Sequence, residues 1–293
     1  MSRLVRAELF KLRTTNAWWL FALTTLLSTL VMLVVVAVSA HSLLKPFAQY
    51  LAVASHGHAA NLPPEFLARL TDEWTLGHPA TTQAVALYTA GQLPGVLLAC
   101  LLGVVLVTSE YYHQTATTTF LLTPRRTEVV IAKLVTAVLL AGLAWLASSV
   151  LSVVAGALFL HAEGYGSQLG HGDVLRALVL NLAAYLLWAV FGVGVGALVR
   201  HQLAATVGVT VLYLVGASAA STVFELLNTY VLQRDWVLTA QVIVPTVASA
   251  VMISPTKTFD QSPAPWVGAL VLLAYGLLLG GLGVGILRRR DVA

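Results

Sequence analysis

The residue types that usually perform catalysis or bind metals are few and scattered in this chain. The single cysteine, Cys100, lies inside an apolar run, so no internal disulfide can form. The sequence has no Gly-Lys pair, hence no Gly-x-x-x-x-Gly-Lys-Ser/Thr phosphate loop, and no His-Glu-x-x-His zinc motif. The histidines with a polar context have no carboxylate or cysteine at ligand spacing beside them, so we interpret them as solvated and expect neither a metal site nor a catalytic site. They are His41, His56, His58 and His78.

The polar stretch 108–128 has a composition suited to docking another protein. It is rich in threonine and aromatic side chains and joins two long apolar runs. Glu110 closes the first run. Thr123 followed by Pro124 is typical of a helix N-cap with proline at the first helical position, so the next helix should begin there. Lys133 then lies within snorkelling reach of the membrane edge. The chemistry that this stretch predicts is contact with a partner rather than catalysis.

The overall composition requires that the elements around this stretch lie in a membrane. Of the 293 residues, 58% are hydrophobic and only 10% are charged, and the mean hydropathy is +0.86. A soluble domain carries about 25% charged residues, so this chain cannot cover a globular surface in water. Lipid leaves no partner for backbone polar groups, which restricts the chain to helices or a closed barrel. The apolar runs are too long and continuous for barrel strands, so we predict an all-α membrane protein.

Six apolar segments are long enough to cross about 30 Å of hydrocarbon as helices, within a single transmembrane domain over 1–293. A seventh apolar segment, 237–253, is at the lower limit of length and contains Pro245, so we interpret it as an interfacial or re-entrant segment on the outer side. The predicted spans are 17–40, 85–107, 129–160, 177–199, 203–222 and 266–287.

The distribution of basic residues predicts the orientation of these spans. With six spans and a cytoplasmic amino terminus, eleven of the sixteen lysines and arginines lie on the cytoplasmic side, including the cluster Arg288–Arg290. This bias follows the positive-inside rule, and a seventh span would move the terminal cluster outside. The basic residues lie at the ends of apolar runs and form no long tract, so nucleic-acid binding is not expected.

The amino-terminal segment 2–16 has the pattern of a basic helix lying on the membrane surface. Val5, Leu9 and Leu12 share one helical face, and Arg3, Arg6 and Arg13 gather on another. Two tryptophans then indicate where the chain enters the bilayer. The residues that define this elbow helix are Arg3, Arg6, Lys11, Arg13, Trp18 and Trp19. Because the following apolar run has about 24 residues, we interpret it as a retained helix rather than a signal peptide.

Three sequence features together resemble the permease subunits of the type-2 ABC exporter family. They are the start Ala7-Glu-Leu-Phe-Lys-Leu-Arg13, the stretch Glu110…Thr115…Pro124-Arg-Arg…Lys133, and the ending Arg289-Arg-Asp-Val292. The resemblance implies six spans, an elbow helix, a coupling helix in the first cytoplasmic loop, and short re-entrant helices between spans five and six. It also implies two ATPase subunits that hold ATP and Mg, a second permease subunit as a homodimer or close relative, and no cofactor in this chain. The residues that we expect to couple to the ATPase are Glu110, Thr115, Phe120, Pro124, Arg125 and Arg126.

Two other classes of function remain open at this stage. A secondary carrier or channel would work without an ATPase, but such proteins normally have a charged group at depth, and no predicted span has one near its middle. A membrane enzyme or scaffold would need clustered His, Asp or Ser at one membrane face. We therefore expect an exporter of a hydrophobic or amphipathic substrate (drug, lipid, peptide or polymer) in a bacterial plasma membrane.

Overall fold

The computed structural model describes residues 2–15, 17–55, 63–114, 126–199, 201–234, 236–254 and 261–289. Helices dominate, and none of these residues forms a β-strand. A π-helical turn, η2 (Asn228–Leu232), and a 3-10 turn, η3 (Gln241–Ile243), accompany the α-helices. In chain order the α-helices are α1 (Ser2–Thr14), α2 (Ala17–Leu43), α3 (Phe47–Ala54), α4 (Pro64–Gly77), α5 (Ala80–Tyr88), α6 (Gln92–Tyr112), α8 (Arg126–Ala162), α9 (Gly172–Val199), α10 (Gln202–Leu227), α11 (Trp236–Ala240), α12 (Pro245–Ile253) and α13 (Pro265–Arg289).

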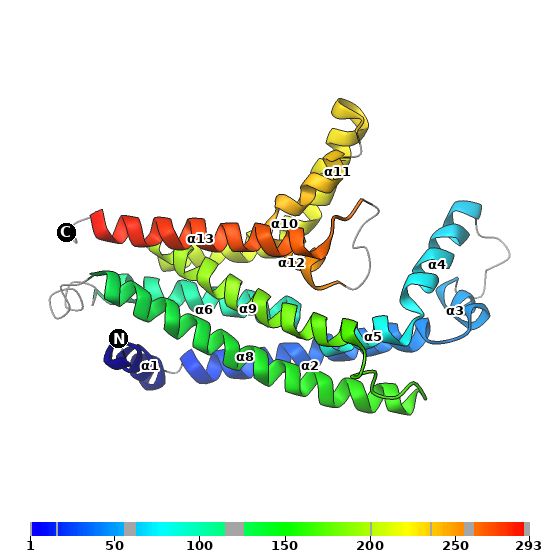
Figure 1. Cartoon of the computed structure of the whole chain (residues 1–293), viewed down its shortest axis with the longest axis horizontal. Coiled ribbons are helices and arrows are strands. Elements are labelled where there is room, and N and C mark those ends of the chain that lie inside the picture. The colour runs from blue at the N-terminus through cyan, green and yellow to red at the C-terminus, as the bar shows by residue number, and fades with distance from the viewer. Residues whose placement is uncertain are drawn as a thin grey trace.

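Six helical segments are long and apolar enough to cross a bilayer, which confirms the predicted fold class. They are α2, α5 with α6, α8, α9, α10 with η2, and α13. Figure 1 shows both ends of the chain at one end of the helical bundle, with α3 and α4 at the other. The even number of crossings that the sequence predicts agrees with this arrangement. The amino and carboxyl termini are therefore on the same side of the membrane, which the distribution of basic residues predicts to be the cytoplasmic side.

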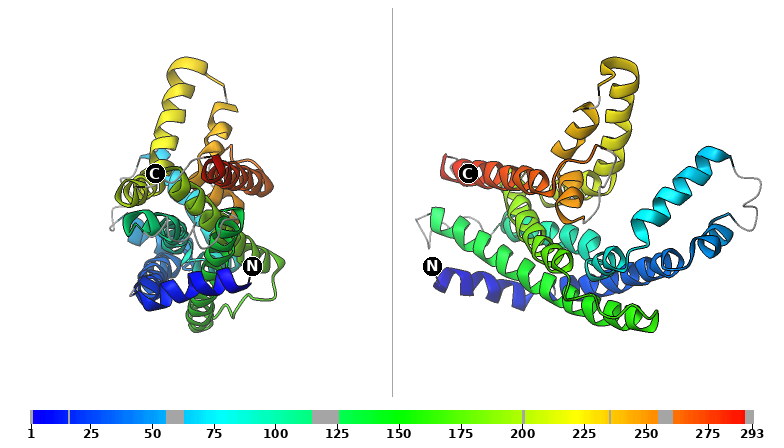
Figure 2. Two further views of the ribbon diagram at one scale, coloured as in Figure 1. Left: turned by 90° about the vertical axis from the view of Figure 1, so that its left-hand side faces the viewer. Right: turned by 45° about the vertical axis from the view of Figure 1, so that its right-hand side comes forward.

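Helix α1 lies across the end of the bundle instead of continuing the direction of α2. Viewed along the bundle, α1 runs sideways beneath the ends of the long helices (Figure 2, left). It packs on α8 and α2. A short helix that lies across the end of the bundle is the arrangement expected of an interfacial elbow.

Span two is broken into α5 and α6, a feature that the continuous apolar run 85–107 did not predict. The break follows from Gly91 and Pro94, since proline cannot donate to the preceding turn. The hydroxyl of Tyr185 on α9 donates to the carbonyl of Gly91 (2.8 Å) and pairs with Ser148 (3.0 Å). The carbonyl of Gly91 also accepts the backbone N–H of Gly95 (2.9 Å), so the Tyr185 bond adds a second donor at the break and satisfies the buried Tyr185 hydroxyl.

The borderline apolar segment is bent rather than straight. The pair Trp236–Ile243 and Pro245–Ile253 meets at an angle of 100°. Val244 at the corner is extended, the conformation favoured before a proline. Nine residues of α12 extend only about 14 Å, half of the hydrocarbon thickness. Nearly all of α12 is buried against α13 and α10, and its close approach to α13 depends on Gly268, where a Cβ would lie 2.3 Å from the carbonyl oxygen of Ala248.

The bent segment makes a prediction about accessibility. Single cysteines at Gln233 and Gln261, which flank the segment, should react with an impermeant thiol reagent from the same side as a cysteine at His171 between α8 and α9. A cysteine at Gln114 should react only after permeabilisation. If the two flanking positions label from opposite sides, the segment is a true span and the six-span topology is wrong.

The connection 41–84 between the first two predicted spans is largely helical. It contains α3 and α4, and α4 covers Pro64–Gly77. Trp74 donates from Nε1 to the carbonyl of Lys45 (2.9 Å), and His78 stacks on Trp74 and lies 3.1 Å from the carbonyl oxygen of Leu43. These contacts fold the connection back onto the end of α2 and leave His78 bonded to backbone.

Helices α6 and α9 form the centre of the bundle because glycines let their backbones touch. A Cβ on Gly192 would lie 2.0 Å from the carbonyl oxygen of Cys100, and one on Gly103 would lie 2.4 Å from that of Ala189. Gly194 packs in the same way against Leu279 of α13. Glycines in membrane helices can serve packing within one subunit or between subunits, and the sequence does not distinguish the two. In this structure Gly192 and Gly194 of α9 pack against other helices of the same chain.

We expect Gly192→Ala to lower the free energy of unfolding by about 2–3 kcal/mol, since backbone must move to accommodate the methyl group. The matched control is Gly208→Ala in α10, where no atom lies within 4 Å of the added Cβ. That change should be neutral or slightly stabilising because alanine is the better helix former. Unfolding in detergent with increasing denaturant measures both, and equal effects would contradict the packing argument.

Candidate functional site

Four charged side chains meet where α1, α6 and α8 come together, at the end of the bundle that carries both termini. Lys133 on α8 binds Glu8 on α1 (2.9 Å) and Glu110 on α6 (3.0 Å). Lys11 on α1 binds the same two carboxylates, at 3.0 Å and 2.7 Å. Each lysine therefore bridges both glutamates, and the four charges sum to zero. We call these four residues the charge cluster.

The local helical pattern explains why these side chains point inward. Glu8 lies one turn from Val5 and from Leu12, on the apolar face of α1 that packs on the bundle. Glu110 is near the end of α6, and Lys133 lies two turns into α8, at matching depth. The Lys133 ammonium also donates to the backbone carbonyl of Leu106 (2.9 Å). Three acceptors therefore surround its three hydrogens, which is the full donor capacity of an ammonium group.

The charge cluster is mostly withdrawn from solvent. The side chains of Lys133, Glu8 and Glu110 are 5%, 6% and 7% exposed, whereas that of Lys11 is 48% exposed. Buried ions are costly unless every partner is present, so this arrangement depends on all four members. The cluster thus connects the elbow helix α1 to α6 and α8, in spans two and three, through ion pairs that share the carboxylates of Glu8 and Glu110.

The charge of Lys11 is secure at neutral pH. Partial burial by itself lowers the pKa of Lys11, but hydrogen bonds and Coulomb attraction from Glu110 and Glu8 outweigh that effect and raise the pKa above its ordinary value. A raised lysine pKa adds stability below the unfolded value, about 10.4, and this contribution is lost as the pH rises through the folded value. Deprotonation of Lys11 should therefore weaken the attachment of α1 only in strong alkali.

The predicted coupling residues are only partly within the described part of the chain. Glu110 is in the charge cluster. Arg126 begins α8, two residues after the start that Thr123 and Pro124 predicted. Thr115, Phe120, Pro124 and Arg125 lie outside the described residues. The two ends of the stretch 108–128 are therefore fixed on α6 and α8, next to the cluster.

The elbow residues divide into two groups. Lys11 belongs to the charge cluster, whereas the others are exposed. The exposed fractions of Trp18 and Trp19 are 52% and 41%, as expected at the level of lipid headgroups. The exposed arginines are Arg3, Arg6 and Arg13.

Sequence reasoning missed Glu8 as a site residue and was wrong about Lys133. We expected Lys133 to snorkel to the membrane edge, but it is 4% exposed and turned inward because two carboxylates and a carbonyl satisfy it there. The available signal was the position of Glu8 within the apolar stripe of an otherwise amphipathic helix. An acid at such a position needs a buried base.

The described residues also line two grooves. One of about 690 Å³ lies near the cluster, between the end of α6 (Tyr111–His113) and the start of α10 (His201–Leu203), and Tyr112 there is 73% exposed. The other, of about 610 Å³, is at the opposite end of α6 and lies between α5, the first turn of α6, the middle of α10, and α12. Its lining mixes apolar with hydroxyl and amide side chains, and Thr246 Oγ1 has no hydrogen-bond partner among the described residues.

The histidines do not assemble a metal site in the described part of the chain, where no three His, Cys, Asp or Glu side chains come together in a suitable way. His41 lies 2.6 Å from a carboxylate oxygen of Glu163 at the far end of the bundle. His56 and His58 lie outside the described residues.

Comparison with known proteins adds no relative. No protein-family model matches this sequence, and no curated protein matches it. The class of protein is therefore inferred from the chain's own features. It folds into α-helices, six helical segments are long enough to span a membrane, and many leucines and valines along them are exposed. The chain is a multi-pass helical membrane protein with six candidate spans and one bent apolar segment.

Proposed function

We propose that this chain is the membrane-spanning permease subunit of an ATP-driven exporter of the type-2 ABC class. Two such subunits face each other in a bacterial plasma membrane, and two separate ATPase subunits bind beneath them. ATP and Mg belong to those ATPase subunits, since this sequence has no phosphate loop. This chain supplies the path for a hydrophobic or amphipathic substrate, and no catalytic residues.

The observation that carries the proposal is the charge cluster at the ends of the stretch 108–128. An ATPase that moves this stretch displaces the end of α6 and the start of α8. Because Glu8 and Lys11 bind Glu110 and Lys133, α1 moves with them. A movement of the ATPase is thus transmitted to α1, α6 and α8. A permease that does not bind nucleotide itself depends on such transmission.

The groove beside the cluster supports a docking surface that is wider than the loop alone. Tyr112 and His113 at the end of α6 line the same groove as His201 and Gln202 at the start of α10. Aromatic side chains often dominate the free energy of protein interfaces. A partner bound in this groove contacts spans two and five.

The groove between α6, α10 and α12 supports a route for substrate. It is lined by both apolar side chains and unbonded or weakly bonded polar groups, as binding sites for amphipathic molecules are. Gln92 lies 3.5 Å from Ser249, a contact that leaves both groups free to bond a substrate. The first turn of α6 lines this groove together with α5, and the far end of the same helix carries Glu110, so displacement of α6 along its length would change the groove.

The proposal is tested by purifying the tagged chain from its native membranes and assaying hydrolysis of ATP in the purified material. We expect ATPase activity and an ATPase subunit in a one-to-one ratio to the chain, because hydrolysis must be supplied by another protein. Transport by the reconstituted chain alone, with no associated ATPase, would overturn the proposal and favour a secondary carrier or channel.

A further inference from the structure

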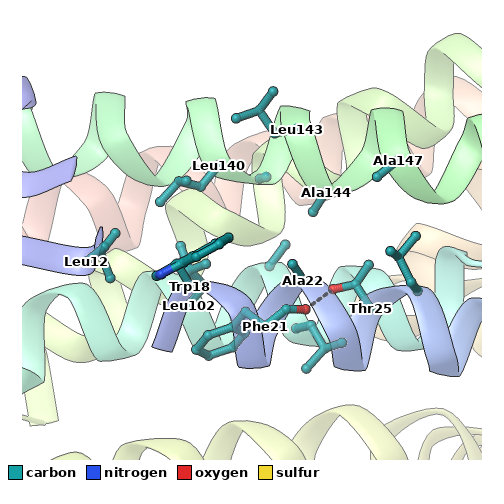
Figure 3. A pocket seen from close by; sticks show the side chains of 14 residues that line it. Leu12, Trp18, Phe21, Ala22, Thr25, Leu102, Leu140, Leu143, Ala144 and Ala147 are labelled. Carbon is teal, nitrogen blue, oxygen red and sulfur yellow. Dashed lines mark hydrogen bonds between the residues drawn. The ribbon is translucent and has the colours of Figure 1, made fainter. Parts of the chain in front are cut away.

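One pocket near the α1 end of the bundle is almost entirely apolar. It has a volume of about 230 Å³ and lies between α2, α6 and α8, with Leu12 of α1 at one end. Figure 3 shows leucine and alanine side chains of α8 on one side and Trp18 and Phe21 of α2 on the other. The one polar lining residue is Thr25, whose hydroxyl donates to the carbonyl of Phe21 (2.7 Å). An occupant therefore finds hydrocarbon and no free hydrogen-bonding group.

A basic mouth continues this pocket toward the end of the bundle. A second pocket of about 210 Å³ shares Leu12, Trp18 and Leu140 with the first and is also lined by Arg13. Arg13 is exposed and makes no ion pair with any residue that the structure describes. The indole nitrogen of Trp18 lies at the end of the ring nearest Leu12 (Figure 3), and the described residues offer it no hydrogen-bond partner. Two free donors thus stand at the opening of an apolar cavity.

The charge of α1 selects the kind of molecule that fits. Glu8 and Lys11 neutralise each other within the charge cluster, which leaves the arginines of α1 uncompensated on its exposed side. The apolar pocket would add no binding free energy for a free phosphate, and Arg13 would add none for an uncharged hydrocarbon. The molecule that uses both parts has an acyl chain and an anionic headgroup, and it is abundant at this depth of the cytoplasmic leaflet.

We propose that this pocket binds one anionic phospholipid, with part of an acyl chain between α2 and α8 and the phosphate on Arg13 and Trp18. The site is separate from the substrate groove at α12, and the proposal does not depend on the exporter assignment. A lipid held here would fill the space between Leu12 of α1 and Trp18 of α2. It would thereby support the position of Lys11 in the charge cluster.

The test uses the full chain in bilayer nanodiscs that contain a trace of photoreactive phosphatidylglycerol, with a diazirine in one acyl chain. Phosphatidylcholine with the same chains is the comparison. After illumination, mass spectrometry measures labelling of the peptides that contain Trp18–Leu26 and Leu140–Ala147. We expect phosphatidylglycerol to label both peptides and phosphatidylcholine to label them at least about fivefold less, the factor that corresponds to about 1 kcal/mol for one arginine at an anionic surface.

Two pairs of variants separate the two parts of the site. Arg13→Gln should reduce labelling by phosphatidylglycerol about fivefold, whereas Arg3→Gln, the same charge change on the same helix, should not. Ala144→Phe fills the pocket and should reduce labelling to background, whereas Leu146→Phe on the exposed face of α8 should leave it unchanged. Equal labelling by the two lipids, or equal effects within either pair, would overturn the proposal.

Discussion

Replacing Lys133 with methionine is expected to lower the free energy of unfolding by about 3 kcal/mol. The change leaves the buried carboxylates of Glu8 and Glu110 with the half-exposed Lys11 as their only described cation. Breaking a buried ion pair on one side is costly because the remaining charge stays in a poorly hydrated place. Denaturant unfolding of the purified protein in detergent measures the effect.

A second change should restore most of the lost stability. Adding Glu8→Gln to Lys133→Met removes one charge of each sign and leaves the Lys11–Glu110 pair, at 2.7 Å, intact. The double variant should therefore be more stable than Lys133→Met alone, which is a non-additive result that only interacting residues give. Lys45→Met near the other end of α2 is the control and should change little. A control effect as large as that of Lys133→Met, or simple additivity, would refute the cluster.

Replacing both Phe120 and Arg125 with alanine is expected to weaken capture of the ATPase about 30-fold. This figure corresponds to about 2 kcal/mol, the cost of truncating one dominant aromatic contact at an interface. The sequence places these residues between the two anchored ends of the stretch 108–128, away from the charge cluster. The variant should fold and insert normally. Copurification of the ATPase from detergent extracts and substrate transport by the reconstituted complex measure the loss.

Two further variants make this result specific. Arg288→Ala, near the end of α13, also removes a positive charge on the predicted cytoplasmic side but lies outside the stretch 108–128. This variant should still capture the ATPase. Glu110→Gln should retain capture as well, yet reduce transport per ATP hydrolysed, because the end of α6 is then less firmly held to α1 and α8. Full capture and transport in the Phe120 and Arg125 double variant would show that the stretch is not the docking site.

The sequence by itself determined the elements of this protein. Apolar length predicted all six spans, since a helix in lipid satisfies its own backbone and needs only enough hydrophobic residues. The pattern of arginines and leucines predicted α1, and Pro245 with the short apolar run set 237–253 apart from the spans as an interfacial or re-entrant segment, where the structure has a bent pair of helices. Whether a segment forms a helix or spans the membrane depends on residues close together in the sequence, so the sequence alone is sufficient to predict it.

The tertiary structure decided which of those residues act together. Glu8 and Lys133 are 125 positions apart, and Lys11 and Glu110 are 99 apart. The inward turn of Lys133 leaves no periodic signal in its own segment, and neither does the bond that Tyr185 of α9 donates to the carbonyl of Gly91. A buried charge or hydroxyl is stable only when a distant partner lies at bonding distance. That condition depends on how helices pack, and hydropathy along the chain does not encode it.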